Sequence, residues 1–207
     1  MRLLYIVLCV LLASCVQNIV QQAAIVQKSF QVKEANYTVR LEYPIISGAS
    51  DALNNQLALA ALTHLEQVED DPIPFKDYAR NFGVDAAGQQ WANEAILTIA
   101  HQTPATVTTL CKTYTNTGAA HPSVYHHYEV YDASSGRRLE LNDLLEDGKL
   151  DAIRAIANVK GDFPNEPEIG LLKDALVFRP DPDARTVPDT KIEYAKLKGI
   201  LKPQFFP

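Results

Sequence analysis

The sequence predicts an α+β fold: a mainly antiparallel sheet with two longer helices packed on one of its faces. Thr, Val, Tyr and Ile dominate several strand-like runs between residues 91 and 141, and short turns separate these runs. Helical spacing of apolar residues occurs only before and after this region. Strands that follow one another without strict alternation with helices favour an α+β fold over a parallel α/β fold.

The first expected structure is a strand region that begins at Ser29. Apolar residues alternate with polar ones there, and the alternation slips by one residue near positions 34–36. This pattern predicts one long strand, or two short strands with a bulge, ended by Pro44 and the Ile-Ser-Gly-Ala segment at 46–49. The alternating residues are Phe30, Val32, Tyr37, Val39, Leu41 and Tyr43.

The clearest helix is expected after Ser50, which can cap its amino end. Apolar residues recur there at the three- and four-residue spacing of one helix face. Residues 72–74, Pro-Ile-Pro, end this helix, and residues 75–82 are expected to form a second one closed by Gly83. The apolar face comprises Leu53, Leu57, Ala60, Ala61, Leu65 and Val68.

The remaining elements follow from composition and turn signals. Gly136 suits the positive φ of a hairpin turn at 132–136, and Asn142 or Asp143 is expected to cap a short helical turn. Expected strands are 95–101, 105–115, 123–131, 138–141, 175–178 and 190–194. Expected helical segments are 150–159 and 195–201.

The first fifteen residues resemble a bacterial lipoprotein signal peptide. Arg2 supplies a positive start, residues 3–12 form an apolar stretch, and Ala13 and Ser14 precede Cys15 as small residues. The apolar stretch is shorter than the about 20 residues that a membrane-spanning helix needs. We therefore expect cleavage before Cys15, whose thiol would carry a diacylglyceryl group.

A multiply acylated cysteine holds a protein firmly on the membrane, because each buried methylene of an acyl chain contributes about 0.8 kcal/mol. The protein is then anchored to the membrane without spanning it. The residue after the cysteine is Val16, whereas an aspartate at this position resembles an inner-membrane retention signal. We therefore expect an outer-membrane protein that faces the periplasm. The expected organisation is a signal peptide at 1–14, a tether at 15–28, a single α+β envelope domain at 29–201 and a tail at 202–207.

Charge and cysteine content narrow the function classes further. The formal net charge is −6, and the chain has no cluster of Lys and Arg, which argues against a nucleic-acid partner. After cleavage and lipidation Cys111 is the single free cysteine, so we expect no internal disulfide. We interpret Cys111 as a small apolar strand residue rather than a reactive thiol.

The densest group of chemically active side chains lies in residues 116–127, which hold His121, His126 and His127. Three histidines invite a metal interpretation. On a regular strand His126 and His127 point to opposite faces, and His121 lies about 20 Å from His127 at about 3.3 Å per residue. We therefore expect no metal site, and we interpret these residues as structural or as ligand-binding.

Motifs for catalysis are missing from the sequence. There is neither a Gly-x-Ser-x-Gly nucleophile elbow nor a His-Glu-x-x-His helix. Asp181 and Asp183 form a carboxylate pair, but the prolines beside them indicate a loop. The expectation is a protein that is not an enzyme and needs no cofactor.

Five segments together resemble a known domain family. They are Tyr43-Pro44, the helix with Asn54 and Asn55, the Thr-Gly-Ala-Ala-His-Pro segment at 117–122, the Tyr-Asp-x-x-x-Gly-x-x-Leu-x-Leu-x-Asp-Leu-Leu segment at 131–145, and Ile192-Glu-Tyr. The resemblance covers about residues 29–201. It is to a domain of unknown function found in lysozyme-sensing anti-sigma factors and beside the catalytic domain of certain peptidoglycan deacetylases.

The resemblance implies an α+β envelope module that binds a ligand. The expected function is a noncatalytic lipoprotein that binds a lysozyme-like protein, a toxin or peptidoglycan. The candidate ligand-binding residues are Asn116, His121, Tyr125 and His127. Two alternatives are a cell-wall hydrolase that uses the His121 segment and a structural or assembly lipoprotein of the outer membrane.

Overall fold

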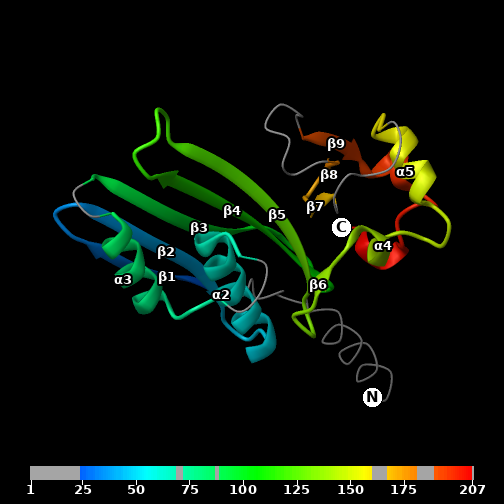
Figure 1. Ribbon diagram of the computed structural model, residues 1–207. Helices are drawn as coiled ribbons and strands as arrows, with labels where there is room; N and C mark the ends of the chain where they lie inside the picture. The colour runs from blue at the N-terminus through cyan, green and yellow to red at the C-terminus, as the bar shows by residue number, and fades with distance from the viewer. Residues whose placement is uncertain (1–23, 69–71, 87–88, 160–166, 181–188, 207) are drawn as a thin grey trace, which may run out of the picture.

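The computed structural model describes residues 24–68, 72–86, 89–159, 167–180 and 189–206, which form two sheets with helices (Figure 1). The predicted signal peptide, Cys15, Asp181 and Asp183 lie outside these ranges. Within them, each helix is too short or too polar to cross a bilayer.

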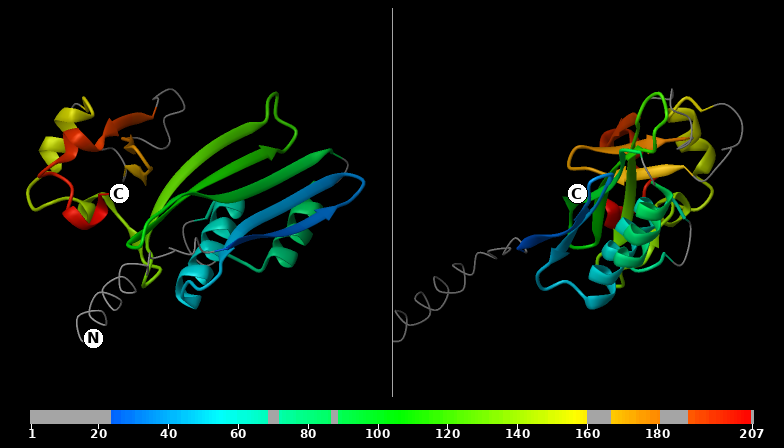
Figure 2. Two further views of the ribbon diagram at one scale, coloured as in Figure 1. Left: turned by 180° about the vertical axis from the view of Figure 1, so that it is seen from behind. Right: turned by 60° about the vertical axis from the view of Figure 1, so that its left-hand side comes forward.

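The larger sheet has six strands in the order of the chain. All neighbouring pairs are antiparallel except β2 and β3, which are parallel because the helices α2 and α3 connect them. This arrangement confirms the predicted α+β fold with two main helices on one face (Figures 1 and 2). The strands are β1 (Ile25–Lys33), β2 (Tyr37–Ile46), β3 (Trp91–Gln102), β4 (Thr106–Asn116), β5 (Ser123–Asp132) and β6 (Arg138–Leu139).

The first strand region is a hairpin of β1 and β2 rather than one long or bulged strand. The slip in alternation marks its turn, where Glu34 N–H donates to the Tyr37 carbonyl at 2.9 Å. Ile25 pairs with Ile46 at the other end, so β1 begins four residues before Ser29, the expected start of the domain. The residues 25–28, expected in the tether, belong to the sheet.

Strand β2 runs through Pro44 and ends at Ile46, the first residue of the expected closing segment 46–49. Pro44 stands opposite Gln27 in β1, yet the pairing of β2 with β3 stops at Glu42. A proline offers no N–H to a neighbouring strand. The side-chain amide of Gln27 in β1 reaches across β2 and donates to the Leu97 carbonyl of β3 at 2.8 Å. It supplies a hydrogen-bond donor just beyond the last residue pair of β2 and β3.

Helix α2 (Asp51–Glu66) forms as expected, with the Ser50 hydroxyl accepting from Leu53 N–H at 3.2 Å. Helix α3 (Phe75–Asp85) instead continues through Gly83, which was expected to end it. A Cβ at Gly83 would lie 2.5 Å from the Tyr37 ring. Gly83 therefore allows the close approach of β2 to the helix, a long-range role that local sequence does not reveal.

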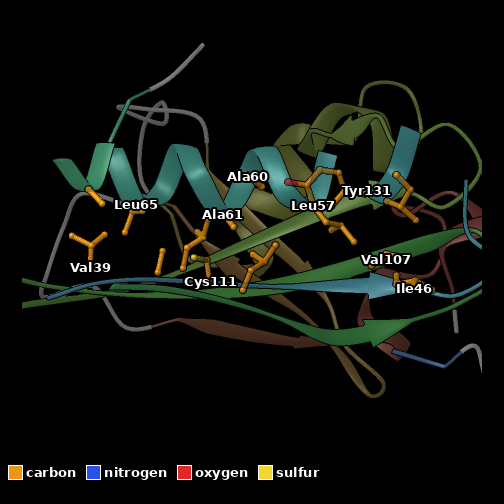
Figure 3. Packing of buried hydrophobic residues seen from close by; sticks show 14 of the residues in the cluster. Val39, Ile46, Leu57, Ala60, Ala61, Leu65, Val107, Cys111 and Tyr131 are labelled. Atoms are coloured by element: carbon orange, nitrogen blue, oxygen red, sulfur yellow. The ribbon is translucent and has the colours of Figure 1, made fainter. Parts of the chain in front are cut away.

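The first hydrophobic core lies between the large sheet and the helices α2 and α3. Figure 3 shows α2 over the sheet, with Leu57 and Ala61 pointing toward Val107 and Cys111. Five residues of the predicted α2 face are buried, and Val68 is 41% exposed because α2 ends at Glu66. The buried five are Leu53, Leu57, Ala60, Ala61 and Leu65.

A second core joins the smaller sheet to the carboxyl-terminal helices. Phe205 and Phe206 pack against this core, so part of the expected tail at 202–207 belongs to the folded unit. The short strand β7 was not predicted. The elements are α4 (Leu141–Leu144), α5 (Leu150–Ile156), β7 (Glu168–Leu171), β8 (Ala175–Arg179), β9 (Thr190–Glu193) and the 3-10 helices η1 (Tyr194–Leu197) and η2 (Pro203–Phe205).

Helix α4 is capped by Glu140 and not by Asn142 or Asp143 as expected. Asp143 instead occupies the third helical position, where its carboxylate accepts from Glu140 N–H at 2.9 Å. The two residues form a reciprocal capping box. The prediction identified the right region but placed the cap two or three residues too late.

Candidate functional site

The predicted ligand-binding segment forms the tip of the β4–β5 hairpin, at residues 117–122. Asn116 is the last residue of β4, and its side-chain oxygen accepts from Gly118 N–H at 3.2 Å. Gly118 has a φ of +81°, which suits glycine. The loop projects beyond the adjacent strands in Figures 1 and 2.

Residues just before β3 and at its start support this tip. A Cβ at Gly118 would lie 2.4 Å from the Gln89 side-chain oxygen, so the loop backbone packs closely on Gln89. The Trp91 indole N–H donates to the same oxygen at 3.0 Å. The Trp91 ring in turn contacts Phe82 of α3, with ring centroids 5.5 Å apart. The hairpin tip is thus held against the first core.

The distal half of the hairpin is uncharged. From Thr113 to Tyr128 the sequence contains no Asp, Glu, Lys or Arg. His121 is exposed in the loop, and Val124, just after it, is 59% exposed. The tip therefore presents polar and apolar groups without formal charge when its histidines are neutral.

Tyr125 and His127 lie elsewhere, on the face of the sheet that α2 covers. The His127 ring stacks between the rings of Tyr125, at 6.2 Å, and of His64 in α2, at 4.7 Å. His127 Nδ1 also lies 2.6 Å from a carboxylate oxygen of Glu168. The four predicted residues are therefore split, with Asn116 and His121 at the tip and Tyr125 and His127 in this inner stack.

Glu168 and Arg179 bind the outer edge of β5. Arg179 donates to the His126 carbonyl, and Glu168 accepts from Tyr128 N–H at 3.4 Å. The two side chains form an ion pair of 2.9 Å with each other. Because β6 pairs only with residues 130 and 131, this ion pair satisfies edge groups that a neighbouring strand would otherwise bind. It joins the two sheets.

A buried carboxylate, Glu129, lies next to this junction. It accepts from the Tyr131 hydroxyl at 2.7 Å and lies 3.6 Å from Arg138. His64 Nε2 is 3.5 Å away, an ion-pair distance without hydrogen-bond geometry. Burial acts to raise the pKa of Glu129, but His64, Arg138 and the Tyr131 hydroxyl outweigh it and hold the pKa at about 2.

Cys111 is fully buried on β4, which confirms its interpretation as an apolar strand residue. Burial and the nearby Glu129 carboxylate raise the pKa of its thiol to about 12. A thiol that stays protonated at neutral pH is a poor nucleophile.

Two cavities flank the turn between β3 and β4, far from the hairpin tip. One of about 580 Å³ is lined by Ile46, Leu53 and Val107 with small and neutral polar residues. The other, of about 420 Å³, is lined by His101 and Phe206 among others. No carboxylate lines either cavity. Among the described residues, no three His, Cys, Asp or Glu side chains are placed to hold a metal ion.

Comparison with known proteins shows the fold but not the function. No family model and no curated protein sequence matches the chain. A DUF3298 family protein from Pseudomonas aeruginosa PAO1 has a similar structure, with a TM-score of 0.64 and 20% identity over 89% of this chain and 96% of that one.

A second solved structure, a DUF3298 family member from Bacteroides fragilis, has a TM-score of 0.60 and 16% identity over 89% of this chain and 97% of that one. The chain therefore has the fold of a family of domains of unknown function. Its finer resemblance to anti-sigma factor and deacetylase domains stays a prediction.

Proposed function

We propose that this protein is a noncatalytic, lipid-anchored bacterial envelope protein that binds its ligand with the tip of the β4–β5 hairpin. The acyl chains on Cys15 hold it on the outer membrane, facing the periplasm. Its ligand is a lysozyme-like protein, a toxin or peptidoglycan, the classes that the family resemblance implies. Binding needs no cofactor.

The position of the tip relative to the amino-terminal end of the domain carries this proposal. The chain enters the large sheet at Ala24, which bonds to Ser47 at one end. Asn116 pairs with Ala92 at the other end, where the β1–β2 turn also lies. A nine-residue strand such as β1 spans about 30 Å at about 3.3 Å per residue. An anchor before Ala24 therefore directs the tip away from the membrane.

The positions of His121 and His127 support a binding function over a hydrolytic one. His127 contacts Glu168 in the junction between the sheets, and His121 stands at the exposed tip. A general acid or base must lie within hydrogen-bond reach of a substrate held in a site. The two cavities near the β3–β4 turn contain neither of these histidines. The structural-lipoprotein alternative predicts instead a fixed membrane partner, which crosslinking in cells would recover.

Retention on candidate ligands tests the proposal. The chain with Cys15→Ser, which cannot be lipidated, is incubated separately with immobilised lysozyme and with purified peptidoglycan. We expect one of the two to retain the folded protein and not a heat-unfolded sample. If neither ligand retains the folded protein, both of these partner assignments are wrong.

A further inference from the structure

Strand β1 has an open outer edge. It is the first strand of the large sheet and pairs only with β2 within the part of the chain that the structure describes. Its nine residues pair in an unbroken register and contain no proline. Ile25, Val26 and Phe30 are between 41% and 57% exposed. Long edge strands without proline or a bulge are ready to pair with another strand.

The hydrogen bonds at both ends of the hairpin show which backbone groups point outward. The Ala24 carbonyl accepts from Ser47 N–H, and Glu34 N–H donates to the Tyr37 carbonyl. Both even-numbered residues thus face β2. Because the direction alternates along an antiparallel strand, the odd-numbered residues of β1 present their N–H and C=O groups at the free edge. These are Ile25, Gln27, Ser29, Gln31 and Lys33.

We propose that two copies of this chain pair through their β1 edges, antiparallel and centred on Ser29. In this register Ser29 faces Ser29 of the second copy, Gln27 faces Gln31, and Ile25 faces Lys33. All five outward residues are used, and each facing pair exchanges two hydrogen bonds. The two six-stranded sheets become one continuous sheet around a twofold axis, the commonest symmetry of homodimers.

The side chains of β1 favour this register over its neighbours. Val26 faces Val32 of the second copy, and Lys28 faces Phe30, where its ammonium can contact the ring. A shift that centres the pair on Lys28 places the two Lys28 ammonium groups opposite each other, which is destabilising. A shift that centres it on Phe30 leaves Ile25 unpaired. The register on Ser29 therefore pairs the most residues without opposing like charges.

Disulfide trapping in the cells that produce the full-length protein tests this pairing. Directly opposite residues in a hydrogen-bonded pair have Cα atoms about 5.5 Å apart, a distance that a disulfide spans. We expect Ser29→Cys to form a covalent dimer under mild oxidation. Gln27→Cys alone should not, because two copies of residue 27 lie about 13 Å apart along the strand. Combining Gln27→Cys with Gln31→Cys should restore the dimer.

Val84→Cys is the matched control, since Val84 is 71% exposed on α3 and is not part of the β1 edge. Cys111 is buried in the core and does not compete. The proposal is wrong if Ser29→Cys crosslinks no more than Val84→Cys, or if Gln27→Cys crosslinks as well as Ser29→Cys. A disulfide from Ser29→Cys to a different protein would also overturn self-pairing.

A second variant measures the non-covalent dimer. Gln31→Pro removes an outward N–H while leaving the hydrogen bonds between β1 and β2 intact. In sedimentation experiments on the Cys15→Ser chain we expect a dimer, and a monomer once Gln31→Pro is added. A dimer that persists with Gln31→Pro contradicts the pairing. If that variant does not fold, the trapping experiment decides.

Discussion

Ionised Glu129 stabilises the fold in a pH-dependent way that Glu129→Gln removes. The side chain is buried, and its pKa falls from the ordinary value of 4.5 to about 2 in the folded protein. A lowered folded-state pKa means that the stabilisation is complete above the unfolded pKa and is lost as the pH falls through 4.5 to about 2. A pKa lowered this far stabilises the folded protein by about 3 kcal/mol, because a tenfold change in an equilibrium constant corresponds to about 1.4 kcal/mol.

Urea unfolding at about pH 7 and about pH 3 measures this effect. From the two pKa values, wild-type protein is expected to lose about 2 kcal/mol more than Glu129→Gln between these pH values. The side-chain oxygen of the glutamine can still accept the hydrogen bond that the Tyr131 hydroxyl donates to Glu129 at 2.7 Å. The comparison therefore isolates the charge.

Other acidic groups do not disturb this comparison. The pKa of Asp132 is also held at about 2, by hydrogen bonds from the Ser134 hydroxyl and the backbone of Ser135, but Asp132 is present in both proteins and cancels. If wild type and Glu129→Gln lose equal stability between these pH values, His64, Arg138 and Tyr131 do not lower the pKa of Glu129.

Three further predictions use matched pairs or a single readout. Gly136→Ala should destabilise the fold by about 1–3 kcal/mol more than Gly148→Ala in thermal unfolding. Both glycines have a positive φ, but only a Cβ at residue 136 would meet another backbone atom, at 2.7 Å. Equal losses of stability would contradict this. In urea unfolding, Leu57→Ala should lower the free energy of unfolding by about 2–5 kcal/mol, because Leu57 is buried in the first core. Leu59 is 40% exposed, so Leu59→Ala should lower it by about 0.5 kcal/mol or less. Similar losses for the two variants would refute the core assignment. Cys15→Ser should move the protein from the membrane to the soluble fraction and abolish palmitate labelling, whereas unchanged labelling would exclude Cys15 as the lipid site.

The predicted elements were right where local pattern and burial agree. The spacing from Leu53 to Leu65 predicts α2 because the same residues are buried against the sheet. The end of α3 was wrong because Gly83 serves the approach of Tyr37, a residue distant in sequence. Strand β7 has only four residues and includes Gly170, which packs on the Tyr128 ring, so it has no alternating pattern to detect.

The candidate site was only partly predictable, because some of its contacts join residues that are distant in sequence. The hairpin tip follows from Gly118 and the local turn residues, and these lie close in sequence. The stack of His64 on His127, and the contact of His127 with Glu168, depend on three separate elements. His64 has the spacing of an ordinary helix residue, so no sequence signal connects it to His127.

Binding at the hairpin tip is tested most directly by the affinity of two matched variants for the ligand that retains the wild type. Val124→Asp places a charge on the uncharged tip, and Val84→Asp places the same charge on an exposed site of α3. Calorimetry should show at least about tenfold weaker binding for Val124→Asp, or about 1.4 kcal/mol, and unchanged binding for Val84→Asp. Equal affinities of wild type and Val124→Asp would contradict binding at the tip.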